Sequence, residues 1–233
     1  MTEIRGLLFD KDGTLFDFAA TWVAWAEAFL LRASDGDRDL AVRVGQDIGF
    51  DLDTRQFARD SIVIAGTPGE VTTALLPHFP AMDHAALLVM LNEEASAAPQ
   101  REAVPLMPLL QGFRSRGLAL GVATNDAEAP ARAHLGSAGV TQMFDFIAGF
   151  DSGHGGKPAP GQMLAFAAQV GLPAGAIAMV GDSTHDLHAG RAAGMICVAV
   201  LTGLATADEL GPFADVVLPD IGHLPGWLDG RAG

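Results

Sequence analysis

The chain has 233 residues, 49% hydrophobic and 18% charged, which is enough for a large buried core. Its formal net charge of −14, from 28 Asp and Glu against 14 Lys and Arg, argues against a nucleic-acid or anionic-membrane partner, since both need clustered cations. The single Cys197 excludes an intrachain disulfide, and no apolar run approaches the roughly 18 residues of a membrane span, so we expect a cytoplasmic location.

The first predicted element is a buried strand over Ile4–Phe9, which ends at Asp10. Residues 16–103 then offer helical runs with no clear strand between them, so we expect a helical insert after the first strand. This insert carries 14 acidic and 6 basic residues and is not a basic nucleic-acid module. Its clearest predicted helices are Phe18–Leu31, Ala74–Phe79 and Asp83–Ala97.

The rest of the chain alternates short apolar runs, typical of buried parallel strands, with segments of helical spacing that each end at a glycine. This alternation predicts an α/β fold with a doubly wound parallel sheet. The predicted strands are Leu118–Ala123, Phe146–Phe150, Ala176–Val180 and Cys197–Leu201. The predicted helices are Pro105–Arg116, Ala127–Ala138, Ala159–Val170 and Asp186–Ala193.

Reactive polar residues follow four of the predicted strands. Ligands of open α/β sheets bind outside the carboxyl ends of the strands, so we expect these residues to share one pocket. They are Asp10 and Asp12, Thr124 and Asn125, Lys157, and Asp182 with Asp186.

Each of these residue types suits phosphoryl transfer. A carboxylate can attack phosphorus and hold the phosphoryl group, and three aspartates satisfy the preference of Mg²⁺ for oxygen ligands. Lys157 supplies a fixed positive charge for the phosphoryl oxygens, and the Thr124 hydroxyl supplies a neutral donor.

Four segments together resemble, in order, the motifs of the haloacid dehalogenase-like hydrolase superfamily. They are Asp10-Lys11-Asp12-Gly13-Thr14-Leu15, Thr124-Asn125, Lys157-Pro158 and Gly181-Asp182-Ser183-Thr184-His185-Asp186. The resemblance spans essentially the whole chain. It implies a Rossmann-like core over residues 1–16 and 104–233, with an α-helical cap over residues 17–103.

The resemblance also implies roles for the motif residues. Asp10 is expected to be the nucleophile, and Asp12 the general acid that protonates the leaving alcohol and then activates water. Mg²⁺ is expected on Asp10, the backbone carbonyl of Asp12 and Asp182, with Asp186 supporting its water shell. Thr124, Asn125 and Lys157 are expected to bind the phosphoryl group, and Lys157 also to pair with Asp10.

Two observations indicate which branch of the superfamily the chain belongs to. Dehalogenases typically lack the second aspartate of the first motif, but this chain has it as Asp12, which favours phosphate esters. The phosphonatase branch needs a lysine in the cap, but the only lysines are Lys11 and Lys157, and neither lies in the predicted cap. The closest resemblance is to the phosphoglycolate phosphatase-like group. We therefore expect a Mg²⁺-dependent phosphatase for a small phosphorylated metabolite such as phosphoglycolate. A β-phosphoglucomutase-type phosphotransferase and a catalytically silent binding protein stay open, as does the oligomeric state.

Several other residues have a structural and a functional interpretation. His185 and His188 have helical spacing but no thiolate nearby, so zinc binding is disfavoured. His154 is either a substrate contact or part of a loop. The spacing of Trp22, Trp25 and Phe29 favours the core of the cap over a stacking platform. The segments Phe16–Phe18 and Ala98–Val104 are expected hinges between core and cap.

Overall fold

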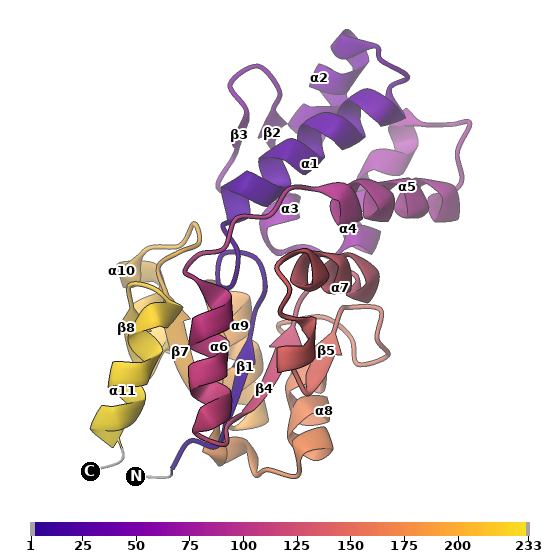
Figure 1. Cartoon of the computed structure of the whole chain (residues 1–233). Helices are drawn as coiled ribbons and strands as arrows, with labels where there is room; N and C mark the ends of the chain where they lie inside the picture. Colours follow the sequence, from indigo (N-terminus) through magenta and orange to yellow (C-terminus); the bar gives the residue numbers. More distant parts are fainter. Residues whose placement is uncertain (1–2, 232–233) are drawn as a thin grey trace.

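The computed structural model describes residues 3–231, with Ala65 described by its backbone alone. Its core is a parallel sheet of six strands in the order β5-β4-β1-β6-β7-β8 (Figure 1). The five predicted strands of the core are confirmed to within about two residues at each end. A sixth, β8, was not predicted. The strands are β1 (Gly6–Phe9), β4 (Ala119–Ala123), β5 (Phe146–Ala148), β6 (Ile177–Gly181), β7 (Ile196–Val200) and β8 (Val216–Leu218).

Strand β1 lies inside the sheet and is buried on both faces. Leu8 pairs in register with Gly121 of β4 on one side and with Met179 of β6 on the other. Leu7 and Phe9 pack into one hydrophobic cluster, whereas Leu8 packs into a second. This alternation follows from the two-residue period of a strand and explains the uninterrupted apolar run before Asp10.

Helices cover both faces of this sheet, as a doubly wound fold requires. Helices α6 and α11 contribute to the cluster on one face, and α8 and α9 to the cluster on the other (Figure 1). Helix α9 begins at Thr184, two residues before the predicted start, because Ser183 and Asp186 form a capping box. The core helices are α6 (Leu106–Ser115), α7 (Glu128–Ser137), α8 (Gly161–Val170), α9 (Thr184–Ala193), α10 (Ala207–Leu210) and α11 (Leu224–Arg231).

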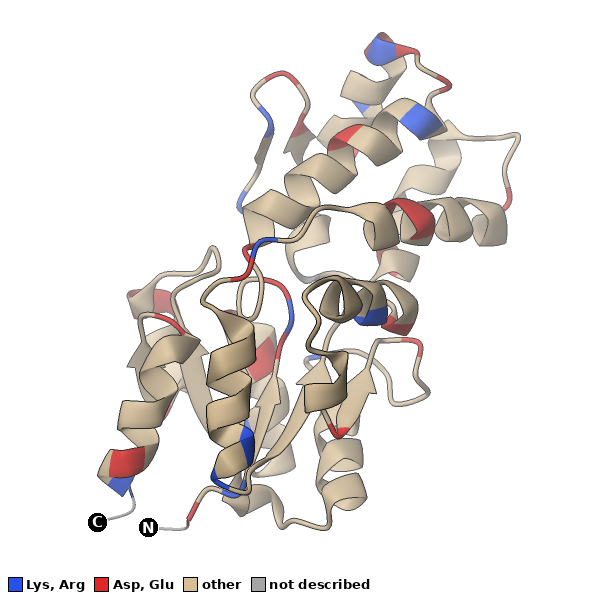
Figure 2. Cartoon of the chain, in the orientation of Figure 1, with Lys and Arg blue, Asp and Glu red and all other residues tan. Residues whose placement is uncertain are grey.

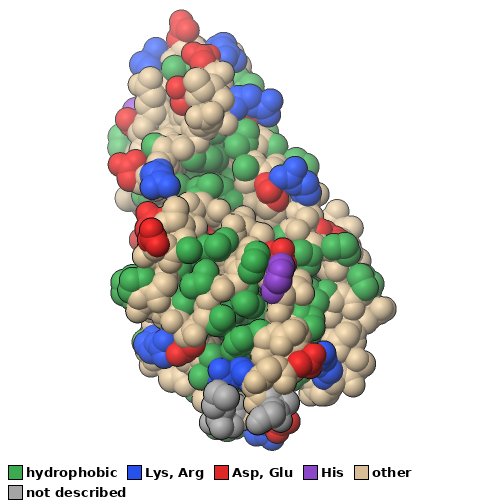
Figure 3. All heavy atoms as spheres, turned by 90° about the vertical axis from the view of Figure 1, so that its left-hand side faces the viewer, with side chains coloured by type: hydrophobic (Ala, Val, Ile, Leu, Met, Phe, Trp, Pro, Cys, Tyr) green, Lys and Arg blue, Asp and Glu red, His purple; other side chains and the backbone are tan. Residues whose placement is uncertain are grey.

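The cap is a helical layer with a hydrophobic cluster of its own, to which Trp22, Trp25 and Phe29 belong, as predicted. The middle of the cap shows hydrophobic side chains in Figure 3, and charged side chains lie toward its edges. Figure 2 shows Lys and Arg spread over both parts, with acidic residues on both parts as well. The cap helices are α1 (Phe18–Ala33), α2 (Arg38–Asp47), α3 (Ile62–Ala65), α4 (Pro68–Leu75) and α5 (His84–Ala97).

Two predictions for the cap are wrong. The insert does contain strands, because β2 (Phe50–Asp51) and β3 (Gln56–Phe57) form a short antiparallel pair. Two residues per strand are too few to show a period-2 pattern. The helix predicted over Ala74–Phe79 is α4, which starts earlier because Thr67 and Glu70 form a capping box, and it is followed by the 3₁₀ turn Leu76–His78.

Two chain segments join the cap to the core, and they lie side by side. The Asp17 N–H donates to the Arg101 carbonyl at 2.8 Å, and the Ala103 N–H donates to the Leu15 carbonyl at 2.9 Å. Over the described residues, no helix combines the length and apolarity needed to span a bilayer.

Candidate active site

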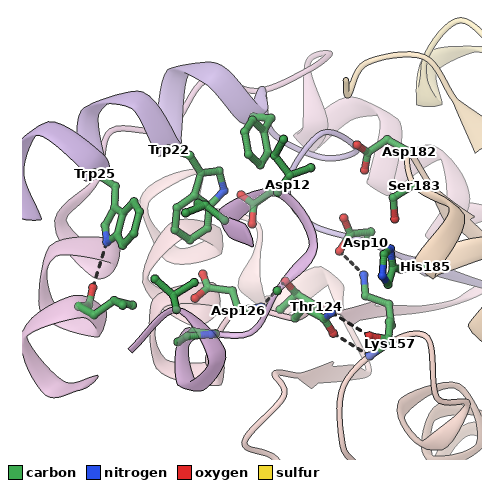
Figure 4. Close-up of a pocket in the computed structure, with 18 residues that line it drawn as sticks. Asp10, Asp12, Trp22, Trp25, Thr124, Asp126, Lys157, Asp182, Ser183 and His185 are labelled. Carbon is green, nitrogen blue, oxygen red and sulfur yellow. Dashed lines mark hydrogen bonds and ion pairs between the residues drawn. The ribbon is translucent and has the colours of Figure 1, made fainter. Parts of the chain in front are cut away.

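The polar residues that follow the strands meet in one pocket beneath the cap (Figure 4). Six of the seven predicted site residues line it, and the seventh, Asp186, contacts Lys157 directly behind it. The lining residues are Asp10, Asp12, Thr124, Asn125, Lys157 and Asp182. The parallel sheet brings them together because the carboxyl ends of its strands share one edge.

Asp10, which directly follows β1, contacts a buried lysine. Lys157 Nζ lies 2.5 Å from Asp10 Oδ1 and 2.6 Å from Asp186 Oδ1. Burial raises the pKa of Asp10 to about 7, although the charge of Lys157 pulls it down. Burial alone would lower the pKa of Lys157, but the two carboxylates outweigh burial and raise it, so this ammonium stays charged. The site therefore has a fixed cation between two carboxylates.

Asp182 follows β6 and lies tightly against the backbone. The Thr14 hydroxyl donates to Asp182 Oδ1 at 3.3 Å. A Cβ at Gly203 would stand 1.7 Å from Asp182 Oδ2, and one at Gly13, where φ is +78°, would stand 2.3 Å from it. Burial, then Asp10 and Asp186, raise the pKa of Asp182 well above its ordinary range. The two glycines therefore make room for this carboxylate.

Three carboxylates form a group with the donor chemistry of a hard cation. Among residues 3–231, Asp10, Asp182 and Asp186 are the one such group of three, with ligand atoms within 4.8 Å of one another. Asp186 is already engaged, because Oδ1 accepts from Lys157 and Oδ2 accepts from the Ser183 N–H and hydroxyl. Buried negative charge exceeds the single ammonium of Lys157, and oxygen donors suit Mg²⁺. The residues therefore fit Mg²⁺ on Asp10 and Asp182, with Asp186 behind them.

Thr124 and Asn125 follow β4 and differ in their contacts. Asn125 Oδ1 accepts from the Lys157 N–H at 2.7 Å, and its Nδ2 donates to the Lys157 carbonyl at 3.0 Å. This pair of hydrogen bonds fixes the backbone that carries Lys157. Thr124 Oγ1 accepts from the Asp126 N–H at 3.1 Å. Among residues 3–231 the Thr124 hydroxyl accepts this bond and has no acceptor for its own proton, so it can donate to a ligand in the pocket.

Asp12 belongs to a network that the sequence did not predict. The neighbouring Lys11 is fully buried, and its Nζ lies 2.8 Å from Asp12 and 3.3 Å from Asp126 Oδ2. The same ammonium donates to His134 Nδ1 at 2.9 Å and stands 5.6 Å from the ring centre of Trp22 in the cap. Asp12 is therefore held by a lysine that touches both core and cap.

The histidines divide as follows. His185 lines the pocket, whereas the ring of His188 packs against that of Phe213, with ring centres 4.7 Å apart. Neither histidine belongs to the group of three carboxylates. His154 is exposed in a loop and does not line the pocket, which favours its interpretation as a loop residue over a substrate contact. Trp22 and Trp25 lie in the cap core as predicted, yet they also form the pocket wall, which the core interpretation alone did not foresee.

The parallel sheet thus carries an aspartate, a lysine and further carboxylates close together at its carboxyl edge. The family model of the haloacid dehalogenase-like hydrolases matches residues 4–194. The chain therefore belongs to this family and is a hydrolase.

Relatives and solved structures resemble the chain over most of its length. It is 29% identical over 221 residues to a probable phosphatase IndB of Dickeya dadantii (strain 3937), covering 92% of this chain and 88% of that protein. It is 31% identical over 216 residues to a phosphoglycolate phosphatase of Xanthomonas campestris pv. campestris (strain 8004), covering 92% and 91%. The crystal structure of a predicted phosphoglycolate phosphatase from Haemophilus somnus 129pt shares the fold, with a TM-score of 0.72, 17% identity, and coverage of 97% and 99%.

Proposed function

We propose that the chain is a Mg²⁺-dependent phosphatase that hydrolyses the phosphate monoester of a small metabolite through an aspartyl-phosphate on Asp10. The observation that carries this proposal is the contact of Asp10 with the buried Lys157, in a pocket that Asp12 and Asp182 also line. The phosphatase names of the relatives support the reaction type, and the name phosphoglycolate phosphatase makes phosphoglycolate the reference substrate.

The proposed reaction needs two proton transfers at Asp12. Asp10 attacks phosphorus, and the P–O bond to the alcohol breaks as the alcohol oxygen takes a proton from Asp12. Asp12 then takes a proton from water, the water oxygen attacks phosphorus, and the Asp10 carboxylate leaves. One water is consumed, and the products are the alcohol and inorganic phosphate.

Other residues bind the charge of the phosphoryl group. Lys157 supplies a fixed positive charge, Thr124 supplies a hydroxyl donor, and Asn125 completes the phosphoryl-binding set. Mg²⁺ would be held by Asp10, Asp182 and the backbone carbonyl of Asp12, with Asp186 in support, and when bound it offsets the repulsion between anionic site and anionic substrate.

We also propose that residues 17–103 move as a cap on a core of residues 1–16 and 104–233. The paired segments around Asp17 and Arg101 are then the hinges, and closure excludes water from the reacting phosphoryl group.

The experiment is phosphate release from ethyl phosphate and phosphoglycolate, with Mg²⁺ and with chelator, by the wild type and by Asp10→Asn. We expect release only with Mg²⁺ and a loss of at least about 10³-fold in Asp10→Asn, since the nucleophile is removed. Full activity in Asp10→Asn refutes the nucleophile. Isomerisation of a hexose phosphate that depends on a bisphosphate and outruns phosphate release identifies a phosphotransferase instead.

A further inference from the structure

The wall of the pocket that faces the reacting residues is apolar. Its cap side is built by residues of α1, α3, α4 and α5, and Figure 4 shows Trp22 and Trp25 at the end of the pocket away from Asp182. Most of these side chains are also packed in the hydrophobic cluster of the cap, so the wall is backed by a packed core. The apolar lining includes Phe18, Trp22, Trp25, Ile64, Val71 and Leu91.

This wall offers no cation to the leaving group. Within residues 3–231, Lys157 is the only lysine or arginine that lines the pocket, and Asp10 and Asp186 engage it. Lys11 is fully buried behind the wall and held by Asp12 and Asp126. An anionic leaving group such as glycolate would lose hydration against apolar side chains and gain no ion pair, which is unfavourable.

The wall does offer aromatic surface and one donor. Trp22 and Trp25 meet edge to face, with ring centres 5.3 Å apart, and Trp25 Nε1 donates to the Leu91 carbonyl at 3.2 Å. Trp22 lines the pocket, and among residues 3–231 its Nε1 has no hydrogen-bond acceptor yet is not one of the fully buried unpaired atoms, so its N–H is open to a ligand. A ligand with a ring and an acceptor atom would satisfy both features.

We propose that the leaving alcohol of the substrate carries an uncharged aromatic or heteroaromatic group, which packs against Trp22 and accepts a hydrogen bond from its Nε1. The proposal rests on the proposed phosphatase function and names its substrate class. The reaction is the one proposed above. The phosphoryl group passes from the alcohol oxygen to Asp10, and the alcohol oxygen takes a proton from Asp12.

The first experiment compares three esters of primary alcohols, so that the intrinsic reactivity of the leaving group stays similar. Values of kcat/KM are measured for benzyl phosphate, ethyl phosphate and phosphoglycolate. We expect benzyl phosphate to exceed ethyl phosphate by about tenfold or more, the scale of burying a ring, and phosphoglycolate to be the slowest. Equal values, or phosphoglycolate as the fastest ester, overturn the substrate class and leave the phosphatase function standing.

A variant pair tests the charge of the wall directly. Ile64→Lys places a cation on the pocket wall, and Ile64→Met is its neutral control of similar length. We expect Ile64→Lys to raise the kcat/KM ratio of phosphoglycolate to benzyl phosphate by at least tenfold over Ile64→Met. An unchanged ratio in two folded variants overturns the assignment of this wall to the leaving group.

A binding measurement separates the substrate class from catalysis. Two of the three tryptophans line the pocket, so their fluorescence reports its occupancy. Benzylphosphonate and phosphonoacetate, which cannot be hydrolysed as esters, are titrated into the Mg²⁺-loaded wild type. We expect tighter binding of benzylphosphonate by about tenfold. Tighter phosphonoacetate overturns the substrate class, whereas selective binding without turnover of any ester overturns the phosphatase function alone.

Discussion

Removal of the ammonium of Lys11 should destabilise the fold strongly. Lys11→Met keeps the length of the side chain and deletes its charge. Lys11 Nζ lies 3.3 Å from Asp126 Oδ2, the carboxylate side chain is 1% exposed, and this oxygen has no hydrogen-bond partner among residues 3–231, so Lys11 supplies its ion pair. Removing one member of a buried ion pair leaves an uncompensated buried charge and costs about 3–5 kcal/mol. We expect a loss of that size in the free energy of unfolding near pH 8.

The loss should depend on pH, with a sign that the structure dictates. Burial raises the pKa of Asp126 to about 6, while Lys11 pulls it down. Without Lys11 this folded-state pKa rises further above its unfolded value, so the folded variant holds a proton that the unfolded chain has released. Such a group makes stability fall as pH rises. The difference between variant and wild type should therefore be small near pH 5 and largest near pH 8.

Urea unfolding of Lys11→Met, followed by tryptophan fluorescence at both pH values, measures these quantities. Arg132→Met is the matched control, because Arg132 is 49% exposed and its pair with Glu128 should contribute no more than about 1 kcal/mol. The double variant Lys11→Met with Asp126→Asn should recover part of the loss, since the buried charge is gone. A pH-independent loss, or strictly additive losses in the double variant, would refute the reasoning.

Two further changes test how the carboxylates are held. Gly203→Ala places a Cβ 1.7 Å from Asp182 Oδ2, so the Mg²⁺ concentration for half-maximal activity should rise at least tenfold, whereas Gly175→Ala, with nothing within 4 Å, should leave it unchanged. Ser183→Ala removes the side-chain N-cap of α9 and the hydroxyl donor to Asp186, while the backbone N–H donor stays, so it should cost about 0.5–2 kcal/mol of stability and also lower phosphatase activity. Thr206→Ala, which removes a matching capping box from α10, should cost stability and leave activity unchanged. Equal activity of the Ser183 and Thr206 variants would contradict the role given to Asp186.

The gathering of these polar residues at the sheet edge could be predicted because each residue is placed by local features. Asp10 ends an apolar run, Asp182 ends another, and parallel strands bring such ends together whatever lies between them. The core fold followed from the same regularity. Strand β8 was missed because its apolar run, Val216–Leu218, is only three residues long and is half-buried.

The surroundings of Lys11 could not be predicted, because they come from separate parts of the chain. Asp126 follows β4, His134 lies on α7, and Trp22 lies on α1, so only the tertiary fold brings them to one ammonium. The apolar pocket wall is a similar case. Helical spacing placed Trp22 and Trp25 in the cap core, and the same spacing does not tell which edge of that core faces a pocket.

Asp12 and the cap are physically connected. Trp22 belongs to the pocket wall and also covers the ammonium of Lys11, which holds Asp12. His134 extends the link, because its Nδ1 accepts from Lys11 and its Nε2 donates to the carbonyl of Ala95 at the end of α5. Burial, and then the charge of Lys11, lower the pKa of His134 to about 4, so the ring stays neutral and can make both bonds. The position of Asp12 therefore depends on the contacts that the cap makes with Lys11 and His134, which would tie the proposed proton transfer to a closed pocket.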